Sequence, residues 1–152
     1  MPAEFKTMAE MRAFVGREVY VSDWLEITQD RVNKFAEATG DFQWIHVDVE
    51  RAKHESPYGG TIAHGYLTLS LIAKFAMENV LVRDRKSGVN YGLNKARFMG
   101  PVKVRSRIRG RGKLAGLDDI EGGYQTTWIT TVEVEGVDKP VCVVESVGRM
   151  YR

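Results

Sequence analysis

The sequence predicts one α+β domain, spanning residues 1–152, in which a single antiparallel β-sheet wraps around a long central apolar helix. The segment 65–82 (GYLTLSLIAKFAMENVLV) is apolar on nearly every face up to Ala73, which is typical of a helix that the protein surrounds. The second half of the chain holds four consecutive strand-like segments, 87–98, 102–114, 124–136 and 141–152. The loops between them are short, which favours antiparallel hairpins.

The first third of the chain is expected to hold a strand followed by an amphipathic helix. Residues 1–15 predict either a short helix or a loosely held arm, and residues 17–28 (REVYVSDWLEIT) predict a strand. Thr28 is placed to cap a helix whose apolar face recurs at i, i+3, i+4 and i+7, and Gly40 is placed to end it. The residues of that face are Val32, Phe35, Ala36 and Thr39. Asp41 should therefore lie in a loop.

The long helix is expected to follow a bend. Residues 49–56 predict a short helical turn, and the breaker cluster SPYGGT at 56–61 predicts a change of direction. The helix itself is expected from about Ala63 to Val82. Lys74 and Glu78, spaced i and i+4, indicate that its C-terminal half meets water on one side.

The strands are expected to carry one irregularity and to leave open edges. In 87–98 the apolar phase switches between Leu93 and Ala96, which predicts a β-bulge near Asn94, and Pro101 should end that strand. Segment 102–114 alternates apolar with basic residues, and its basic face is expected to pair with Glu133 and Glu135 on the next strand. A second copy of the chain, joined edge to edge as a homodimer, would cover the exposed edges of so small a sheet.

Composition excludes several classes of function. The 22 basic and 20 acidic residues give a formal net charge of +2, which does not favour nucleic acid or an anionic membrane as a partner. Lys74 and Glu78 interrupt the longest apolar segment, which argues against a membrane span. A single cysteine, Cys142, and the absence of an apolar leader predict a cytoplasmic protein.

Two segments carry residues suited to chemistry. In ATGDFQWIHVD (38–48), Asp41 and His46 are five positions apart, so they would meet only if the loop folds back. Taken alone, the pair is more simply explained by a capping Asp and a packed His. In TIAHGYLTLS, Ala63, His64 and Gly65 open the long helix, whose first N–H groups are free to hold a developing oxyanion.

Together these two segments resemble the signature of the MaoC-like dehydratases, which include the R-specific enoyl-CoA hydratases. The family pattern is Gly-Asp-x-Asn-Pro-apolar-His followed by Ala-His-Gly. The chain matches it at Gly40–Asp41, at His46 and at 63–65, and the forms DFQWIHVD and NYGLNK look most like its nodulation protein N-like branch. The resemblance covers roughly residues 15–150 and implies the hotdog fold.

The resemblance implies reversible hydration of a trans-2-enoyl thioester to an R-3-hydroxyacyl thioester. Asp41 and His46 match the catalytic pair, and the Gly65 N–H matches the donor to the thioester oxygen. His64 is expected either to orient the loop or to pack. The substrate-binding set expected around the pair is Gln43, Trp44, Ala63, His64, Gly65 and Asn90.

Some expectations stay open at this stage. Gln43 and Trp44 stand where the family often has Asn and Pro, which bears on acyl-chain preference. We expect no cofactor beyond the coenzyme A of the substrate and no metal, because the three histidines show no clustered spacing. The carrier is either coenzyme A or an acyl-carrier protein. The alternative role for the basic side chains between Lys103 and Lys113, beside the sheet face expected above, is to bind the phosphates of coenzyme A. A thioesterase on the same fold, or a non-catalytic acyl-thioester binder or scaffold subunit, are the alternative functions.

Overall fold

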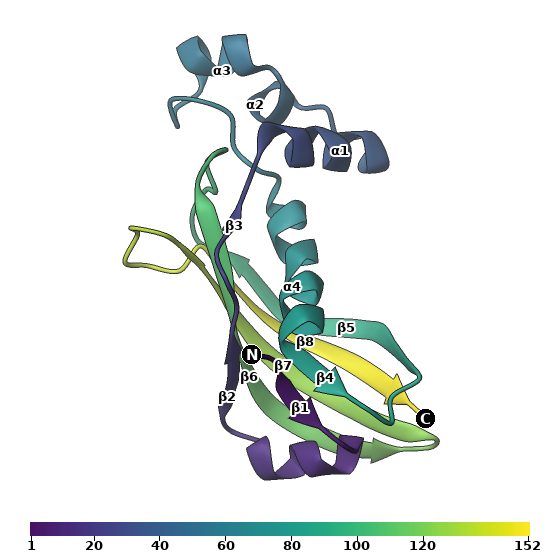
Figure 1. The fold of residues 1–152 in the computed structure, drawn as a ribbon. Coiled ribbons are helices and arrows are strands. Elements are labelled where there is room, and N and C mark those ends of the chain that lie inside the picture. The colour runs from purple at the N-terminus through teal and green to yellow at the C-terminus, as the bar shows by residue number, and fades with distance from the viewer.

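The computed structural model describes residues 1–152 as a curved antiparallel sheet with one long helix against its inner face (Figure 1). The sheet has the order β2-β6-β7-β8-β5, and β3 pairs with β6 beside β2. Its strands are β2 (Glu18–Val21), β3 (Leu25–Glu26), β5 (Ser87–Phe98), β6 (Arg107–Ile120), β7 (Gly123–Val134) and β8 (Cys142–Tyr151). The predicted α+β class, with an antiparallel sheet around a central helix, is confirmed.

The central helix, α4 (Gly65–Asn79), packs one face onto the sheet. Its buried residues are Leu67, Thr68, Leu71 and Phe75. Gly110 of β6 permits this close approach, because a Cβ there would lie 2.7 Å from the Phe75 ring. The opposite flank of α4 is open, with Tyr66 69% and Met77 73% exposed, so a single chain does not surround the helix as expected.

Three short helices gather beyond the N-terminal end of α4 (Figure 1). In α1 (Gln29–Thr39), the Thr28 hydroxyl accepts the Arg31 N–H at 3.1 Å, and Gly40 ends the helix at φ 81°. Both caps were predicted from the sequence. Asp48 caps α3 (Val49–Glu55) by accepting the Arg51 N–H at 3.0 Å. Between them lies α2 (Trp44–Val47), where only a loop was expected.

Of the two alternatives for residues 1–15, the structure has the short helix and not the loosely held arm. A 3-10 helix over Met8–Phe14 follows β1 (Ala3–Phe5), and Met8 and Met11 are fully buried. β1 pairs in parallel with β4 (Val80–Val82), forming a separate two-stranded sheet. That pairing ends α4 at Asn79, three residues before the predicted Val82, because the chain must extend to reach β1.

Two strand predictions need correction in their bounds. Segment 17–28 forms two short strands rather than one, and β6 begins at Arg107 instead of Val102. Residues 101–106 form an irregular connection in which Arg105 has φ 80°. The bulge predicted near Asn94 is confirmed, because the register of β5 against β8 shifts between Leu93 and Lys95.

None of the helices combines the length and apolar character needed to cross a membrane.

Candidate active site

The loop after α1 carries Asp41 at the surface. The Asp41 carboxylate accepts the Gln43 N–H at 3.2 Å, a short-range turn that leads directly into α2. Because α2 turns the chain back, His46 comes to lie beside Asp41. Side-chain atoms of Asp41, His46 and His64 all lie within 4.8 Å of one another. The structure thus brings together residues that the sequence spacing left apart.

His46 is buried, with 7% of its surface exposed, and its ring is oriented by the main chain. Its Nδ1 lies 2.7 Å from the carbonyl oxygen of Ile62, which can only accept. Nδ1 therefore carries the proton, and Nε2 is left as a proton acceptor. Burial, the largest effect, lowers the pKa of His46; the Ile62 carbonyl opposes it, and His64 adds to the lowering. The imidazole is thus held as a neutral base.

His64 closes the cluster from the start of α4. It is 2% exposed, and its Nε2 lies 3.0 Å from the carbonyl oxygen of Asp41. Its ring stacks on that of His46 at 3.9 Å between centroids, and the Phe35 ring also contacts it, at 4.9 Å between centroids. Both expectations for His64, orienting the loop and packing, thus describe its contacts. Its buried Nδ1 makes no hydrogen bond within the protein.

A glutamine that the sequence reading missed ties the two segments together. The side chain of Gln29 donates to the His46 carbonyl oxygen at 2.7 Å and accepts from the Thr61 hydroxyl at 2.7 Å. It also bonds Asn33 within α1. Gln29 directly follows the predicted cap Thr28, but nothing in the sequence distinguishes it from an ordinary polar residue in a first helical turn.

α4 begins at Gly65, two residues after the predicted start at about Ala63, so Gly65 still lies at the helix start. The N–H groups of Gly65 and Tyr66 donate no hydrogen bond within the protein, as expected for a helix start. An added Cβ on Gly65 would lie 3.2 Å from Phe98 of β5, so space at this helix start is tight. Ala63, by contrast, uses its N–H in a 2.8 Å bond to the Val102 carbonyl oxygen. The donors available to a ligand are therefore at Gly65 and Tyr66.

The other predicted substrate-binding residues, Gln43, Trp44 and Asn90, do not lie together in one pocket. Gln43 is exposed ahead of α2, and the half-buried ring of Trp44 lies 4.2 Å beneath the Arg51 guanidinium. Trp44 does not line the cavities between α4 and the sheet. Asn90 lines both of them, beside the β5 register shift that follows it.

These two cavities adjoin along one side of α4. They measure about 490 and 270 Å³, are lined mainly by apolar residues, and share Ala73, Ala76 and Trp128. The larger begins at Leu69, roughly 6 Å along the helix axis from Gly65 at 1.5 Å per residue. An apolar chamber thus lies within about one helical turn of the polar cluster.

The Asp41–His46–His64 cluster bears on the expectation of no metal, which stays a prediction. The sequence spacing suggested no metal site, yet these three side chains are close enough to share one ion. Nδ1 of His46 and Nε2 of His64 already face main-chain carbonyl oxygens, so one nitrogen remains on each ring.

Comparison with known proteins bears on the family to which the chain belongs. The MaoC-like domain family matches residues 10–137. The 3-hydroxyacyl-thioester dehydratase Z of Mycobacterium tuberculosis is 51% identical over 146 residues, covering 95% of this chain and 96% of the relative. Nodulation protein N of Rhizobium leguminosarum bv. viciae is 43% identical over 137 residues, covering 88% and 84%.

A solved structure supports the fold separately. The R-hydratase PhaJ1 of Pseudomonas aeruginosa, in its unliganded form, superimposes with a TM-score of 0.70 at 21% identity, covering 88% of this chain and 78% of that one. At this identity the likeness concerns the fold. With the family match over residues 10–137 and the 51% relative, it shows that the chain belongs to the MaoC-like dehydratase family and adopts its hotdog fold.

Proposed function

We propose that this protein interconverts trans-2-enoyl and R-3-hydroxyacyl thioesters by adding or removing water. The observation that carries the proposal is the neutral His46 ring, which the Ile62 carbonyl oxygen orients and which has a nitrogen within 4.8 Å of the Asp41 carboxylate. The relative named as a 3-hydroxyacyl-thioester dehydratase supports the reaction class, and the resemblance of the motifs at 40–46 and 63–65 to those of the R-specific enoyl-CoA hydratases supports the stereochemistry.

In the proposed mechanism, Asp41 and His46 hold one water molecule between them. As its oxygen attacks C3, the pair takes one proton from the water and supplies one proton to C2, so that the pair ends in its starting state. The thioester oxygen gains negative charge during the attack and accepts the Gly65 N–H at the positive end of α4. Dehydration follows the same path in reverse.

The acyl chain is proposed to enter the chamber between α4 and the sheet. Its larger part, about 490 Å³, falls in the range of small-molecule sites, and its lining is mainly apolar. Asn90 and Trp128 reach both cavities, so they are placed to set acyl length.

The exposed flank beside this chamber is proposed to bind a second copy of the chain. β5 is an edge strand paired only with β8, and it leaves Tyr91 60% and Leu93 50% exposed, close to the open flank of α4. Edges and apolar patches of this kind are usually covered. A homodimer should be seen by light scattering, and Leu93→Glu should dissociate it. Val137→Glu, in the β7–β8 turn at 51% exposure, should not.

The activity test uses purified protein and a short enoyl-CoA, with loss of the conjugated double bond followed by absorbance. Asp41→Asn and His46→Asn should each lower kcat by about 10²–10⁴-fold while circular dichroism and melting temperature show an intact fold. The product should be the R alcohol on a chiral column. Unchanged rates in either variant would refute the assigned roles.

Two other results would redirect the assignment. Release of free thiol without hydration would indicate a thioesterase. Tight binding of acyl-CoA with no turnover would indicate a non-catalytic acyl-thioester binder or a scaffold subunit.

A further inference from the structure

A third pocket lies on the other side of the residues that orient His46. It measures about 300 Å³ and is formed by α3, the turn at 58–61 and the irregular connection at 103–105. Three of its lining side chains, Lys53, Lys103 and Arg105, are cationic, and none is acidic. Three cations around a pocket with no acidic residue in its lining are suited to an anion.

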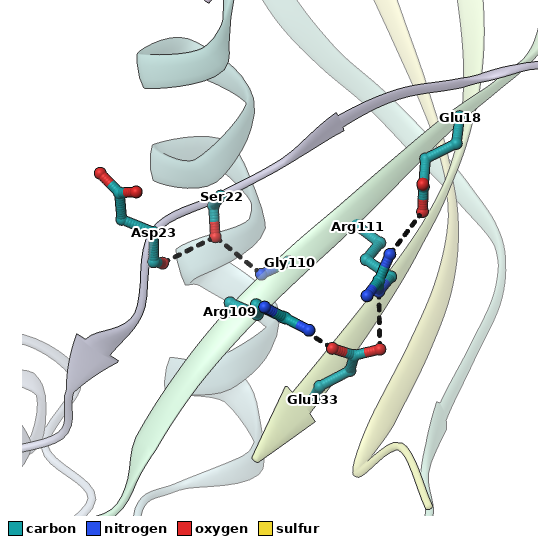
Figure 2. A network of polar contacts seen from close by, with 7 residues as sticks. All are labelled: Glu18, Ser22, Asp23, Arg109, Gly110, Arg111 and Glu133. Atoms are coloured by element: carbon teal, nitrogen blue, oxygen red, sulfur yellow. Dashed lines mark hydrogen bonds and ion pairs between the residues drawn. The ribbon is translucent and has the colours of Figure 1, made fainter. Parts of the chain in front are cut away.

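The structure divides the basic segment 103–113 into two groups. On β6, Arg109 and Arg111 both donate to Glu133, at 2.8 and 2.7 Å, and Arg111 also reaches Glu18 at 3.3 Å (Figure 2). Arg107 pairs in the same way with Glu135 at 2.9 Å. These arginines form the sheet face that the sequence predicted, so their charge is already matched.

Lys103 and Arg105 precede β6 and behave differently. Neither forms an ion pair within the protein, and both are exposed at the pocket. Lys53 contacts Glu50 at 3.1 Å, but that pair is solvent-exposed and weak. The charge of this pocket is therefore available to a ligand.

The backbone of the pocket is also unusual. Arg105 is the single non-glycine residue of the chain with positive φ, at 80°, held there by a 2.7 Å bond from its N–H to the Ile27 carbonyl oxygen. Such a conformation usually favours Gly or Asn, and a long cation occupying it suggests a functional constraint. Across the pocket, the N–H groups of Gly60 and Thr61 donate no hydrogen bond within the protein.

The pocket and the catalytic cluster share a wall. Lys103 pairs with Ile62 in an antiparallel bridge, and the Ile62 carbonyl oxygen is the acceptor that orients His46. Gln29 and Thr61 line the pocket, and the Gln29 side chain also bonds the His46 carbonyl oxygen. A ligand reaching from one site to the other would run along the segment 59–65.

We propose that this pocket binds the phosphate groups of the carrier to which the acyl chain is esterified. The inference rests on the proposed function, since a thioester substrate carries its acyl group on a phosphorylated pantetheine arm. Coenzyme A offers a diphosphate and a 3′-phosphate, and an acyl-carrier protein offers a phosphodiester. Lysine and arginine bind each of these through charge-assisted hydrogen bonds.

The test compares substrates with and without phosphates. In Lys103→Gln/Arg105→Asn, Asn tolerates the left-handed backbone while both charges are removed. The KM for enoyl-CoA should rise about tenfold or more, and kcat should stay within about twofold of the parent. With the N-acetylcysteamine thioester, which has no phosphate, both constants should match those of the parent protein.

The matched control removes two exposed lysines that do not line this pocket, Lys86→Gln/Lys113→Gln. It keeps the same net charge as the test variant and should leave KM for enoyl-CoA unchanged. An equal rise in KM in both double variants, or no rise in KM in the pocket variant, would refute the proposal. An equal rise in KM for enoyl-CoA and for the N-acetylcysteamine thioester would refute it as well.

Further experiments identify the carrier and distinguish a failure of the phosphate-pocket proposal from a failure of the proposed hydratase function. If the pocket variant has a raised KM for the coenzyme A thioester but not for the phosphopantetheine thioester, the pocket binds the 3′-phosphoadenosine end. If KM rises for both thioesters, the pocket binds the phosphate of the pantetheine arm. Binding of adenosine 3′,5′-bisphosphate or free coenzyme A, measured by calorimetry, tests the pocket without turnover. Weaker binding in the pocket variant supports the proposal even if no thioester is hydrated, and equal binding of both ligands in variant and parent contradicts it.

Discussion

The Nε2 of His64 lies 3.0 Å from the main-chain carbonyl oxygen of Asp41, so the first turn of α4 holds the loop that carries the acid. Because that carbonyl can only accept, His64 must donate from Nε2. Replacing His64 by Gln or by Asn distinguishes the effect of this hydrogen bond from the effect of side-chain size. The amide nitrogen of Gln reaches about as far as Nε2, whereas that of Asn reaches only as far as Nδ1.

We expect His64→Asn to lower kcat by about 10²-fold, because a displacement of about 1 Å in the loop misplaces the Asp41 carboxylate. His64→Gln should recover most of that loss. Steady-state kinetics on one enoyl thioester would measure both, with melting temperatures as the control for folding. Equal defects in the two variants would mean that His64 acts through packing alone.

The titration of His46 should make stability depend on pH. Burial lowers the pKa of folded His46 below the 6.5 of an unfolded chain, so the unfolded state binds more protons between those two values. Stability should be full above pH 6.5 and should fall as the pH drops toward the folded pKa. His46→Asn retains an amide donor for the Ile62 carbonyl but does not titrate.

Thermal unfolding between pH 5 and 7.5 would measure this effect. The acid slope of the parent protein should be steeper than that of His46→Asn. Identical slopes would show that the folded imidazole does not resist protonation.

Gln29→Leu should affect both stability and rate. It leaves the His46 carbonyl and the Thr61 hydroxyl without their partner, which costs about 1–3 kcal/mol, or about 2–4 °C in melting temperature for each kcal/mol. The rate constant kcat should fall as well, because α2 loses its tie to α1. Asn33→Ala removes only the exposed bond within α1 and should change neither quantity by much. Equal changes in melting temperature and kcat in the two variants would contradict the proposed link between α1 and α2 through Gln29.

Gly65→Ala tests the donor at the start of α4. Its Cβ would lie 3.2 Å from Phe98 and beside the free N–H, so kcat should fall by up to about 10²–10³-fold. Folding stability should hold, since Ala favours helices over Gly. The double variant Gly65→Ala/Phe98→Leu relieves the ring contact. Full recovery of kcat there would show that the displaced ring, and not a blocked N–H, caused the loss.

Glu133→Gln should alter stability without altering catalysis. Burial alone raises the pKa of Glu133, but the hydrogen bonds from Arg109 and Arg111 outweigh it and hold the pKa below its usual range. The stabilisation, about 1 kcal/mol or less for so accessible a pair, should be present at pH 7 and disappear as the pH falls through that lowered pKa. Denaturant unfolding at pH 7 and below pH 4 would measure it. A change in KM for enoyl-CoA would instead implicate this face in substrate binding.

Local signals made much of the fold predictable. Thr28 and Gly40 bound α1 because capping is decided by a few neighbouring atoms, and the phase switch around Asn94 marks the bulge in β5. The end of α4 was missed because β4 exists only through its pairing with β1, which lies far away in sequence. The irregular start of β6 likewise depends on contacts with Ile27 and Thr61.

In the candidate site too, local motifs were predictable and contacts between distant segments were not. Asp41, His46, His64 and Gly65 were named from their motifs, and the structure gathers them at the start of α4. Their catalytic roles stay predictions. Gln29 escaped notice because its partners are main-chain and hydroxyl groups 17 and 32 positions away. The split of the basic segment also required the structure, since only the folded chain shows which arginines meet Glu133.

The two imidazoles and the α2 backbone are all held by carbonyl oxygens, those of Ile62, Asp41 and His46. Every amino acid supplies such an oxygen, whatever its side chain. A substitution at position 62 can therefore change the side chain and leave the orientation of the His46 ring intact, because that orientation depends on the main chain alone.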